Sequence, residues 1–136
     1  ETLLDIETKN VDGMFVLAFD EISIGDNDNL SALTAVLWSA DLLILFSDID
    51  GVYTDNPKTN PNAELVDLVV DINQLRSNIK VGSANSFGTG GIETKIEAAE
   101  KVTAYGIPMI LANGSHLLAL ENLALGQMRG TLFQGI

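Results

Sequence analysis

The feature that most constrains the fold of this chain is a run of five apolar residues at positions 42–46, which the polar pair Ser47-Asp48 ends at once. A strand that is apolar along its whole length is buried on both faces, as in parallel sheets that helices cover. Further apolar runs at residues 14–19 and 107–112 alternate with segments of helical spacing. This alternation predicts an α/β protein, a layered sheet with right-handed crossovers between its strands.

The same patterns place the other elements of the chain. Helices are predicted over residues 30–40, 71–77, 92–105 and 117–125, strands over residues 65–70 and 130–133, and a loop rich in Gly, Ser, Asn and Thr over residues 82–91. Asp71 is expected to cap the second helix, and Gly106 to stop the third. Ligands in open α/β sheets bind where loops leave the carboxyl ends of the strands. The loops at 25–29, 47–51 and 82–91 are therefore expected to form one site.

Composition restricts the classes of function. The 136 residues carry 7 Lys and Arg against 19 Asp and Glu, a formal charge of −12, and so acidic a surface argues against a nucleic-acid partner. No apolar run approaches the roughly 20 residues of a membrane-spanning helix, and the lack of a signal-like start favours the cytoplasm. The chain has no Cys and one His, His116, which excludes disulfides, thiolate catalysis and metal sites rich in Cys or His.

The turn at residues 25–29 contains Asn27 and Asp28 and has two interpretations. Asp and Asn side chains accept hydrogen bonds from the free amides of a helix start, so the segment is suited to a plain helix cap. Two acids within three residues, Asp26 and Asp28, exceed what a cap requires. The functional alternative is that Asn27 binds a polar substrate while Asp28 orients a cation.

The segment that follows the central apolar run begins with Ser47 and Asp48. An Asp-x-Asp-Gly sequence is often only a turn, and it also matches part of a calcium-binding loop. The calcium interpretation fails, because position 12 counted from Asp48 is Thr59 rather than the Glu that such a loop needs. The alternative function is a contact of Ser47 and Asp48 with the ribose or base of a nucleotide.

A glycine-rich loop opens the predicted helix at residues 92–105. Glycines allow the backbone to approach a phosphate closely, and the helix start supplies free N–H groups and partial positive charge. Lys95 lies in the first helical turn, within reach of the same phosphates, although the spacing is not that of a Walker loop. A phosphate site and a simple turn both remain open here. The candidate phosphate-binding residues are Thr89, Gly90, Gly91, Ile92, Glu93, Thr94 and Lys95.

Four segments resemble one known group of enzymes. They are Gly-Asp-Asn-Asp-Asn-Leu-Ser-Ala at residues 25–32, the stretch at 40–57, Gly-Thr-Gly-Gly-Ile-Glu-Thr-Lys at 88–95 with its continuation to residue 99, and Gly-Thr-Leu-Phe at 130–133. In these segments, and over roughly residues 21–133, the chain resembles the amino acid kinase superfamily and, within it, the glutamate 5-kinase family. The Asp-Gly-x-Tyr loop is shared with uridylate and aspartate kinases, whereas the Gly-Asp-Asn-Asp and Gly-Thr-Gly-Gly pair is more selective.

The resemblance implies a fold and an activity. The fold is a three-layer α/β/α sandwich around a mostly parallel sheet, of the acetylglutamate kinase-like type. The activity is transfer of the ATP γ-phosphoryl group, with Mg²⁺, to the side-chain carboxylate of L-glutamate, giving γ-glutamyl phosphate for proline synthesis. Such enzymes need no His or Cys, because a carboxylate nucleophile needs no general base. A cytoplasmic homo-oligomer, dimer or tetramer, is implied as well.

Residue roles carry over by position. Asn27 resembles a glutamate contact, and Asp28 resembles the organiser of the catalytic centre. Ser47 and Asp48 match the adenine-nucleotide contact pair, with Ser47 in place of the usual Thr. Residues 89–95 match the nucleotide loop, in which Lys95 resembles the lysine that neutralises charge on the phosphates. No protein ligand for a metal is assigned.

Two departures from the family pattern bear on the domain. The first half of such a kinase, with its own Lys and glycine loop, is absent, and residues 1–20 do not match the Asn-Glu-Asn-Asp segment expected before Gly25. Residues 1–136 are therefore expected to be the C-terminal, nucleotide-binding portion of a single kinase domain, inactive by itself. The alternatives are a uridylate, aspartate or acetylglutamate kinase, or a catalytically inactive nucleotide-binding fragment.

Overall fold

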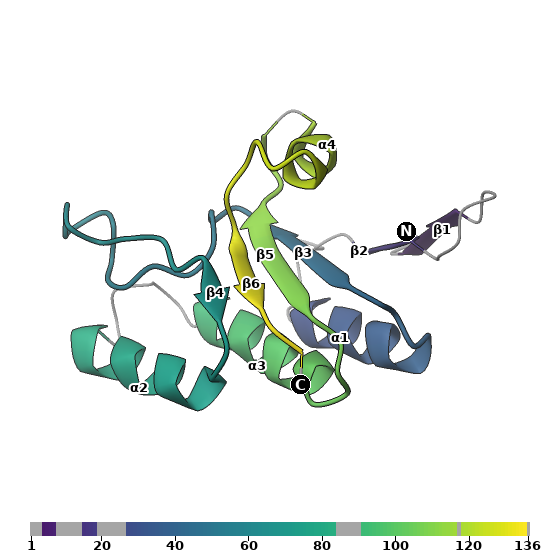
Figure 1. The fold of residues 1–136 in the computed structure, drawn as a ribbon, viewed down its shortest axis with the longest axis horizontal. Helices are drawn as coiled ribbons and strands as arrows, with labels where there is room; N and C mark the ends of the chain where they lie inside the picture. Colours follow the sequence, from purple (N-terminus) through teal and green to yellow (C-terminus); the bar gives the residue numbers. More distant parts are fainter. Residues whose placement is uncertain (1–3, 8–14, 19–26, 84–90, 117, 136) are drawn as a thin grey trace.

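The structure, a computed structural model, describes residues 4–7, 15–18, 27–83, 91–116 and 118–135 (Figure 1). Near the N-terminus, β1 (Leu4–Glu7) pairs with β2 (Phe15–Ala18) as an antiparallel hairpin. β2 confirms the strand predicted at residues 14–19. β1 was not predicted from the sequence, and it is a strand because it pairs with β2.

The main sheet has four strands in the order β3-β5-β6-β4. β3 (Leu43–Ser47) pairs in parallel with β5 (Met109–Asn113), and β4 (Leu68–Val69) pairs in parallel with β6 (Thr131–Phe133). β5 and β6 pair in antiparallel fashion. The sheet is thus mixed with mostly parallel pairings, and the predicted α/β class is confirmed.

Helices α1 (Asn27–Leu37) and α3 (Gly91–Thr103) lie side by side along the sheet (Figure 1). Each returns the chain to the start of a parallel strand, α1 to β3 and α3 to β5. The 11 residues of α1 and the five residues of β3 both span about 16 Å. The amino ends of the helices therefore reach the edge of the sheet at which β3 and β5 end.

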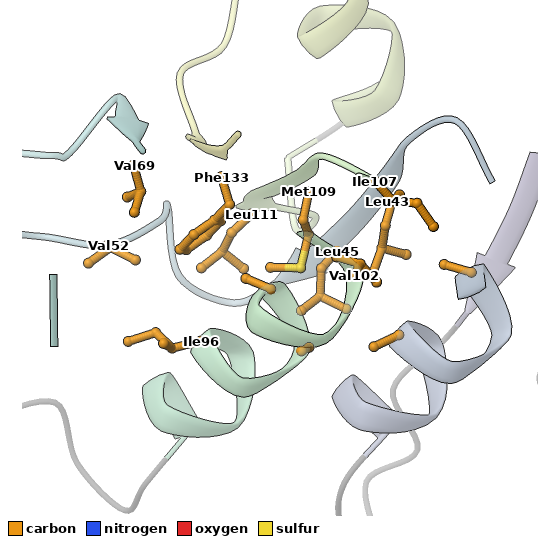
Figure 2. Packing of buried hydrophobic residues seen from close by; sticks show 14 of the residues in the cluster. Leu43, Leu45, Val52, Val69, Ile96, Val102, Ile107, Met109, Leu111 and Phe133 are labelled. Atoms are coloured by element: carbon orange, nitrogen blue, oxygen red, sulfur yellow. The ribbon is translucent and has the colours of Figure 1, made fainter. Parts of the chain in front are cut away.

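The hydrophobic core lies between these helices and the sheet. Leu43 and Leu45 of β3 stand opposite Met109 and Leu111 of β5 in the strand register, so these side chains share one face. All four are buried, and Figure 2 shows them beside Val102 of α3. Burial of such a side chain stabilises the fold by about 1.5–3 kcal/mol, so this contact fixes α3 on the sheet.

The alternate residues of the strands lie on the opposite face. They are Ile44, Ile110 and Leu132, and all three are half-buried. The apolar run at residues 42–46 therefore supplies side chains to both faces of the sheet, but among the described residues the predicted full burial holds for one face only, and Leu42 is exposed. The described residues provide the sheet and the helical layer on one of its faces.

Helix α2 (Ile72–Ser83) is longer than predicted. Its capping is as expected, because the amides of two first-turn residues donate to Asp71 Oδ1 at 2.9 and 3.2 Å. The predicted end at residue 77 is wrong, and so is the assignment of residues 82 and 83 to a loop. Leu75 and Ile79 continue the apolar face that Ile72 begins, and their packing on the core keeps the chain helical.

The other predicted elements are confirmed with shifted ends. α1 begins three residues before the predicted start at residue 30 and ends at Leu37, and Ser39 just beyond it has a left-handed φ of 52°. Gly106, with φ of 79°, ends the segment after α3 as expected. α4 (Ala119–Ala124) is shorter than predicted, and β5 begins only after Pro108. None of the described helices has the length and apolarity to cross a membrane.

Candidate functional site

Two groups of polar side chains lie at the edge of the sheet where β3 and β5 end. The first group, the helix-terminus cluster, consists of Asp28 from the first turn of α1 with Gly91, Thr94 and Lys95 from the first turn of α3. The second group, the strand-end cluster, follows the last residues of β3 and β5. Its members are Ser47, Asp48, Asp50, Tyr53 and Asn113.

An ion pair forms the centre of the helix-terminus cluster. Lys95 Nζ lies 3.1 Å from Asp28 Oδ2, and the two side chains are only 12% and 13% exposed. The Thr94 hydroxyl lies 2.8 Å from the same carboxylate oxygen and 2.9 Å from the Gly91 carbonyl oxygen. A hydroxyl has one proton and donates to one acceptor at a time. Asp28 Oδ2 therefore forms an ion pair with Lys95. The Thr94 hydroxyl donates its proton either to Asp28 Oδ2 or to the Gly91 carbonyl oxygen.

Local structure explains why these groups meet. Asp28 occupies the first turn of α1, where the helix dipole favours a negative charge. Gly91 and Lys95 are four residues apart and so share one face of α3, with Lys95 Nζ 3.5 Å from the Gly91 carbonyl oxygen. The side-by-side packing of α1 and α3 then brings the two charges together.

The start of α3 is suited to an anion. Within the part of the chain that the structure describes, a Cβ built on Gly91 meets no atom within 4 Å, so no described residue crowds this backbone. The first amides of a helix have no partner within the helix, and they carry partial positive charge. Lys95 adds an ammonium group beside these amides, and the Asp28 carboxylate pairs with its charge at 3.1 Å. A phosphate group fits this combination of free amides, uncrowded backbone and an oriented ammonium.

The strand-end cluster is a hydrogen-bonded network. Ser47 and Asn113 stand opposite each other at the ends of β3 and β5. The Asn113 amide donates to Asp50 Oδ1 at 3.1 Å and reaches the Asp48 carbonyl oxygen at 3.5 Å. The Tyr53 hydroxyl donates to Asp50 Oδ2 at 2.8 Å. Both oxygens of the Asp50 carboxylate are therefore engaged.

These bonds change the acidity of two groups. The Asn113 amide, followed by the Tyr53 hydroxyl, lowers the pKa of Asp50 below its ordinary value of 3.8. The bond to Asp50, followed by partial burial, raises the pKa of Tyr53 above its ordinary value of 10.0. At neutral pH the network is an ionised carboxylate between two donors, which is a stable arrangement.

A pocket of about 490 Å³ opens beside the strand-end cluster. Asp50, His116 and Arg129 are among the residues that line it. The volume lies in the range of small-molecule sites. Among the described residues, no group of three or more His, Asp or Glu side chains is placed to hold a metal ion.

The predicted site residues occupy different surroundings. Asn27 is half-buried at the start of α1, and its carbonyl accepts the Ser31 hydroxyl at 2.8 Å. Ile92 packs partly against the core. Glu93 is exposed and lies 3.1 Å from Arg76 of α2. Thr89 and Gly90, like the turn residues 25 and 26, lie outside the described residues.

Ser47 and Asp48 contact each other at the end of β3. The Ser47 hydroxyl donates to Asp48 Oδ1 at 3.2 Å, and Asp48 is exposed. The structure thus brings Asp28, Thr94 and Lys95 into one cluster, and places Ser47 and Asp48 at the same edge of the sheet.

The sequence prediction omitted Asn113, and it assigned no role to Asp50 or Tyr53. Asn113 carries the same signal that identified Ser47, because it is the first polar residue after a buried strand. The contact of Asn113 with Asp50 spans 63 positions in the chain, so local spacing gives no sign of it.

Comparison with known sequences identifies the relatives of this chain. The sequence profile described as the Amino acid kinase family matches residues 8–113. A glutamate 5-kinase of Alkaliphilus metalliredigens (strain QYMF) is 57% identical over 118 residues, which are 87% of this chain and 45% of that protein. A glutamate 5-kinase of Treponema pallidum (strain Nichols) is 56% identical over 110 residues, 81% of this chain and 37% of that protein. The chain spans less than half the length of these relatives.

Comparison with solved structures addresses the fold. The carbamate kinase from Giardia lamblia bound to AMP-PNP has a TM-score of 0.61 at 21% identity, covering 96% of this chain and 41% of that chain. The UMP kinase from Ureaplasma parvum has a TM-score of 0.57 at 21% identity, covering 79% of this chain and 41% of that chain. The described elements therefore share the fold of these kinases.

Proposed function

We propose a function on the basis that this chain belongs to the amino acid kinase family. The complete protein that contains it transfers the γ-phosphoryl group of ATP to the side-chain carboxylate of L-glutamate, the first step of proline biosynthesis. Relatives named glutamate 5-kinase, at 57% and 56% identity, support this acceptor. The observation that carries the proposal is the 3.1 Å contact between Lys95 and Asp28 at the start of α3.

Phosphoryl transfer depends mainly on positioning and on neutralisation of charge. A carboxylate oxygen of glutamate attacks the γ-phosphorus, the bond from that phosphorus to the bridging oxygen breaks, and ADP leaves with the electron pair. Lys95 donates hydrogen bonds to phosphate oxygens in this step. Asp28 holds the Lys95 ammonium in place, and Thr94 supports Asp28 from the same turn of α3.

The other predicted residues surround this centre. Asn27, next to Asp28 in α1, contacts glutamate. The backbone from Thr89 to Lys95 surrounds the phosphates, while Ser47 and Asp48 contact the nucleoside. The kinase from Giardia lamblia that was solved with AMP-PNP supports the use of a nucleotide by this fold. The pocket of about 490 Å³ beside Asp50 offers space for part of such a ligand.

Mg²⁺ is expected to arrive with ATP rather than in a cage of protein ligands. Mg²⁺ in kinases is commonly held through substrate phosphates and one or two carboxylates. When bound, it neutralises phosphate charge, which matters in a chain of formal charge −12. The same family membership supports a cytoplasmic homo-oligomer.

The test is acceptor dependence in the purified full-length protein. ADP formation from Mg-ATP is measured with L-glutamate, aspartate, N-acetylglutamate, UMP and carbamate in parallel, and hydroxylamine traps any acyl phosphate. Glutamate alone should stimulate ADP release and give the hydroxamate. Stimulation by a different acceptor, without stimulation by glutamate, would overturn the proposal. The 136-residue chain expressed alone should show no glutamate-dependent ADP formation.

A further inference from the structure

We propose that Asn113 is a positioning residue, which fixes the backbone at Ser47 and Asp48 for nucleotide binding. The inference rests on the proposed function, which assigns the nucleoside contact to Ser47 and Asp48. Asn113 acts from the neighbouring strand through hydrogen bonds to the loop after β3, and it touches that loop rather than the substrate.

Both the nitrogen and the oxygen of the Asn113 side-chain amide form hydrogen bonds. Its nitrogen donates to Asp50 Oδ1 at 3.1 Å and reaches the Asp48 carbonyl oxygen at 3.5 Å. Its oxygen accepts the Ser115 backbone amide at 2.9 Å and the Ser115 hydroxyl. An amide nitrogen has two protons, so both acceptors on the β3 loop are served at once. One side chain thus joins the loop after β5 to the loop after β3.

The backbone gives this connection a fixed base. The amide of Gly114 donates to the Ser47 carbonyl oxygen at 2.8 Å, which continues the ladder between β3 and β5 by one residue. The Ser47 carbonyl is thereby committed to the sheet. The exposed Asp48 side chain and the Ser47 hydroxyl remain at the end of the strand, 3.2 Å from each other.

The far side of the loop is held independently. The Tyr53 hydroxyl donates to the second oxygen of Asp50 at 2.8 Å. The Val52 amide donates to the buried Thr131 hydroxyl oxygen at 2.9 Å, and that hydroxyl donates to the Val66 carbonyl at 2.6 Å. The loop is therefore anchored at its far end by Thr131 and at Asp50 by Tyr53. Asn113 links the Asp48 carbonyl oxygen to this anchored segment.

Removal of the link should weaken nucleotide binding more than glutamate binding. A loop that is already ordered binds its ligand without the cost of ordering it. In the full-length protein, Asn113→Ala should raise the KM for ATP roughly tenfold, the scale of one hydrogen bond to a charged group. The KM for glutamate should change by less than about twofold, because Asn27 lies on α1.

An exchange of the partners makes the test specific. Asn113→Asp alone places two carboxylates against each other and should raise the KM for ATP at least as much as Asn113→Ala. Adding Asp50→Asn restores one amide facing one carboxylate, but not the bond to the Asp48 carbonyl oxygen, because a carboxylate at position 113 has no proton to donate. The double variant should therefore recover only the loss caused by the two facing carboxylates, and its KM for ATP should return to about that of Asn113→Ala. The matched control is Asn60→Ala, which removes a 3.0 Å amide bond to Asp55 in the loop at residues 54–64 and should leave the KM for ATP unchanged.

The possible results distinguish a failure of the proposed kinase function from a failure of the proposed role of Asn113. A wild-type protein without glutamate-dependent ADP formation overturns the proposed function. An active wild type, with a folded Asn113→Ala variant whose KM for ATP is unchanged or rises in step with that for glutamate, overturns the role of Asn113. Failure of the double variant to improve on Asn113→Asp also counts against it. Binding of AMP-PNP, measured by calorimetry on each variant, gives the same comparison without turnover.

Discussion

Lys95 Nζ and Asp28 Oδ2 lie 3.1 Å apart, although 67 positions separate the two residues in the chain. Their contact joins the amino ends of α3 and α1, and both side chains are almost entirely removed from solvent. Breaking such a pair on one side leaves a buried charge without its partner, which is strongly destabilising. The ammonium is thus already oriented before a phosphate reaches it, and preorganised charge of this kind lowers barriers.

Replacement of Lys95 should affect the chemical step. In the full-length protein, Lys95→Ala should lower kcat by roughly 10²-fold or more, because it removes a preorganised charge beside the phosphates. Steady-state kinetics with saturating ATP and glutamate measure the loss. A turnover equal to that of the wild type would show that Lys95 is only a structural link to Asp28.

Lys101 provides the matched control for this variant. It lies on the same helix, is exposed, and donates a hydrogen bond to Asn29 on the same neighbouring helix α1. Lys101→Ala removes an equal charge and an exposed hydrogen bond between the same two helices, away from the start of α3. Its kcat should remain within about twofold of the wild type. Equal losses in the two variants would indicate that charge or helix packing in general is responsible.

Asn27 should affect the acceptor substrate. If its amide binds glutamate, Asn27→Ala should raise the KM for glutamate about tenfold while the KM for ATP changes little. Asn29→Ala is the control, since Asn29 lies in the same turn but contacts Glu97 and Lys101 of α3. An equal rise in both KM values for Asn27→Ala would favour the capping interpretation of this turn.

Tyr53 should stabilise the protein over a defined range of pH. Its pKa is raised above 10.0 by the bond to Asp50, so the folded state holds the phenolic proton more tightly than the unfolded chain. That stabilisation is complete below pH 10.0 and is lost as the pH rises through the raised pKa. Tyr53→Phe should lower the free energy of unfolding by about 1 kcal/mol at neutral pH.

The difference between wild type and Tyr53→Phe should shrink in alkali as the tyrosine ionises. The partner of Tyr53, Asp50, shows the opposite pH dependence. Its pKa is lowered in the folded state, so the ionised carboxylate stabilises the fold above pH 3.8, and this contribution is lost as the pH falls through the lowered pKa. Denaturant titrations of both proteins from acid to alkaline pH measure these changes. A constant difference across the alkaline range would contradict the assigned bond.

Gly51 should tolerate no side chain. A Cβ there would lie 2.5 Å from the hydroxyl oxygen of Thr131, a fully buried residue that bonds both Val52 and Val66. Gly51→Ala should therefore lower the free energy of unfolding by about 2–3 kcal/mol, through overpacking and distorted hydrogen bonds. Gly126→Ala is the control, because Gly126 has a φ of 71° but a Cβ there would meet no atom of the described residues within 4 Å. It should cost about 1–2 kcal/mol from backbone strain alone, and the reverse order would refute the steric argument.

Much of the fold follows from local patterns of residues. The uninterrupted apolar segment before Ser47 predicts β3 because a strand covered on both faces excludes polar side chains. Asp71 and Gly106 mark helix ends through capping and positive φ, which are properties of single residues and their neighbours. Helix α2 shows where local signals end, since it continues beyond the predicted end at residue 77 and Ile79 packs against the core.

The candidate site, like the fold, was predictable from the sequence only in part. Residue type and spacing identify Asp28, Ser47, Asp48 and Lys95, because free helix amides, glycines and strand ends are visible along the chain. The bond between Asp28 and Lys95 and the link from Asn113 to Asp50 arise only when α1 packs on α3 and β3 pairs with β5. Periodicity reports which face of an element is buried, but not which distant element covers it. The sequence therefore determined the chemical groups and the elements that carry them, and the tertiary structure decided their partners, because strand register and helix packing bring together residues more than 60 positions apart.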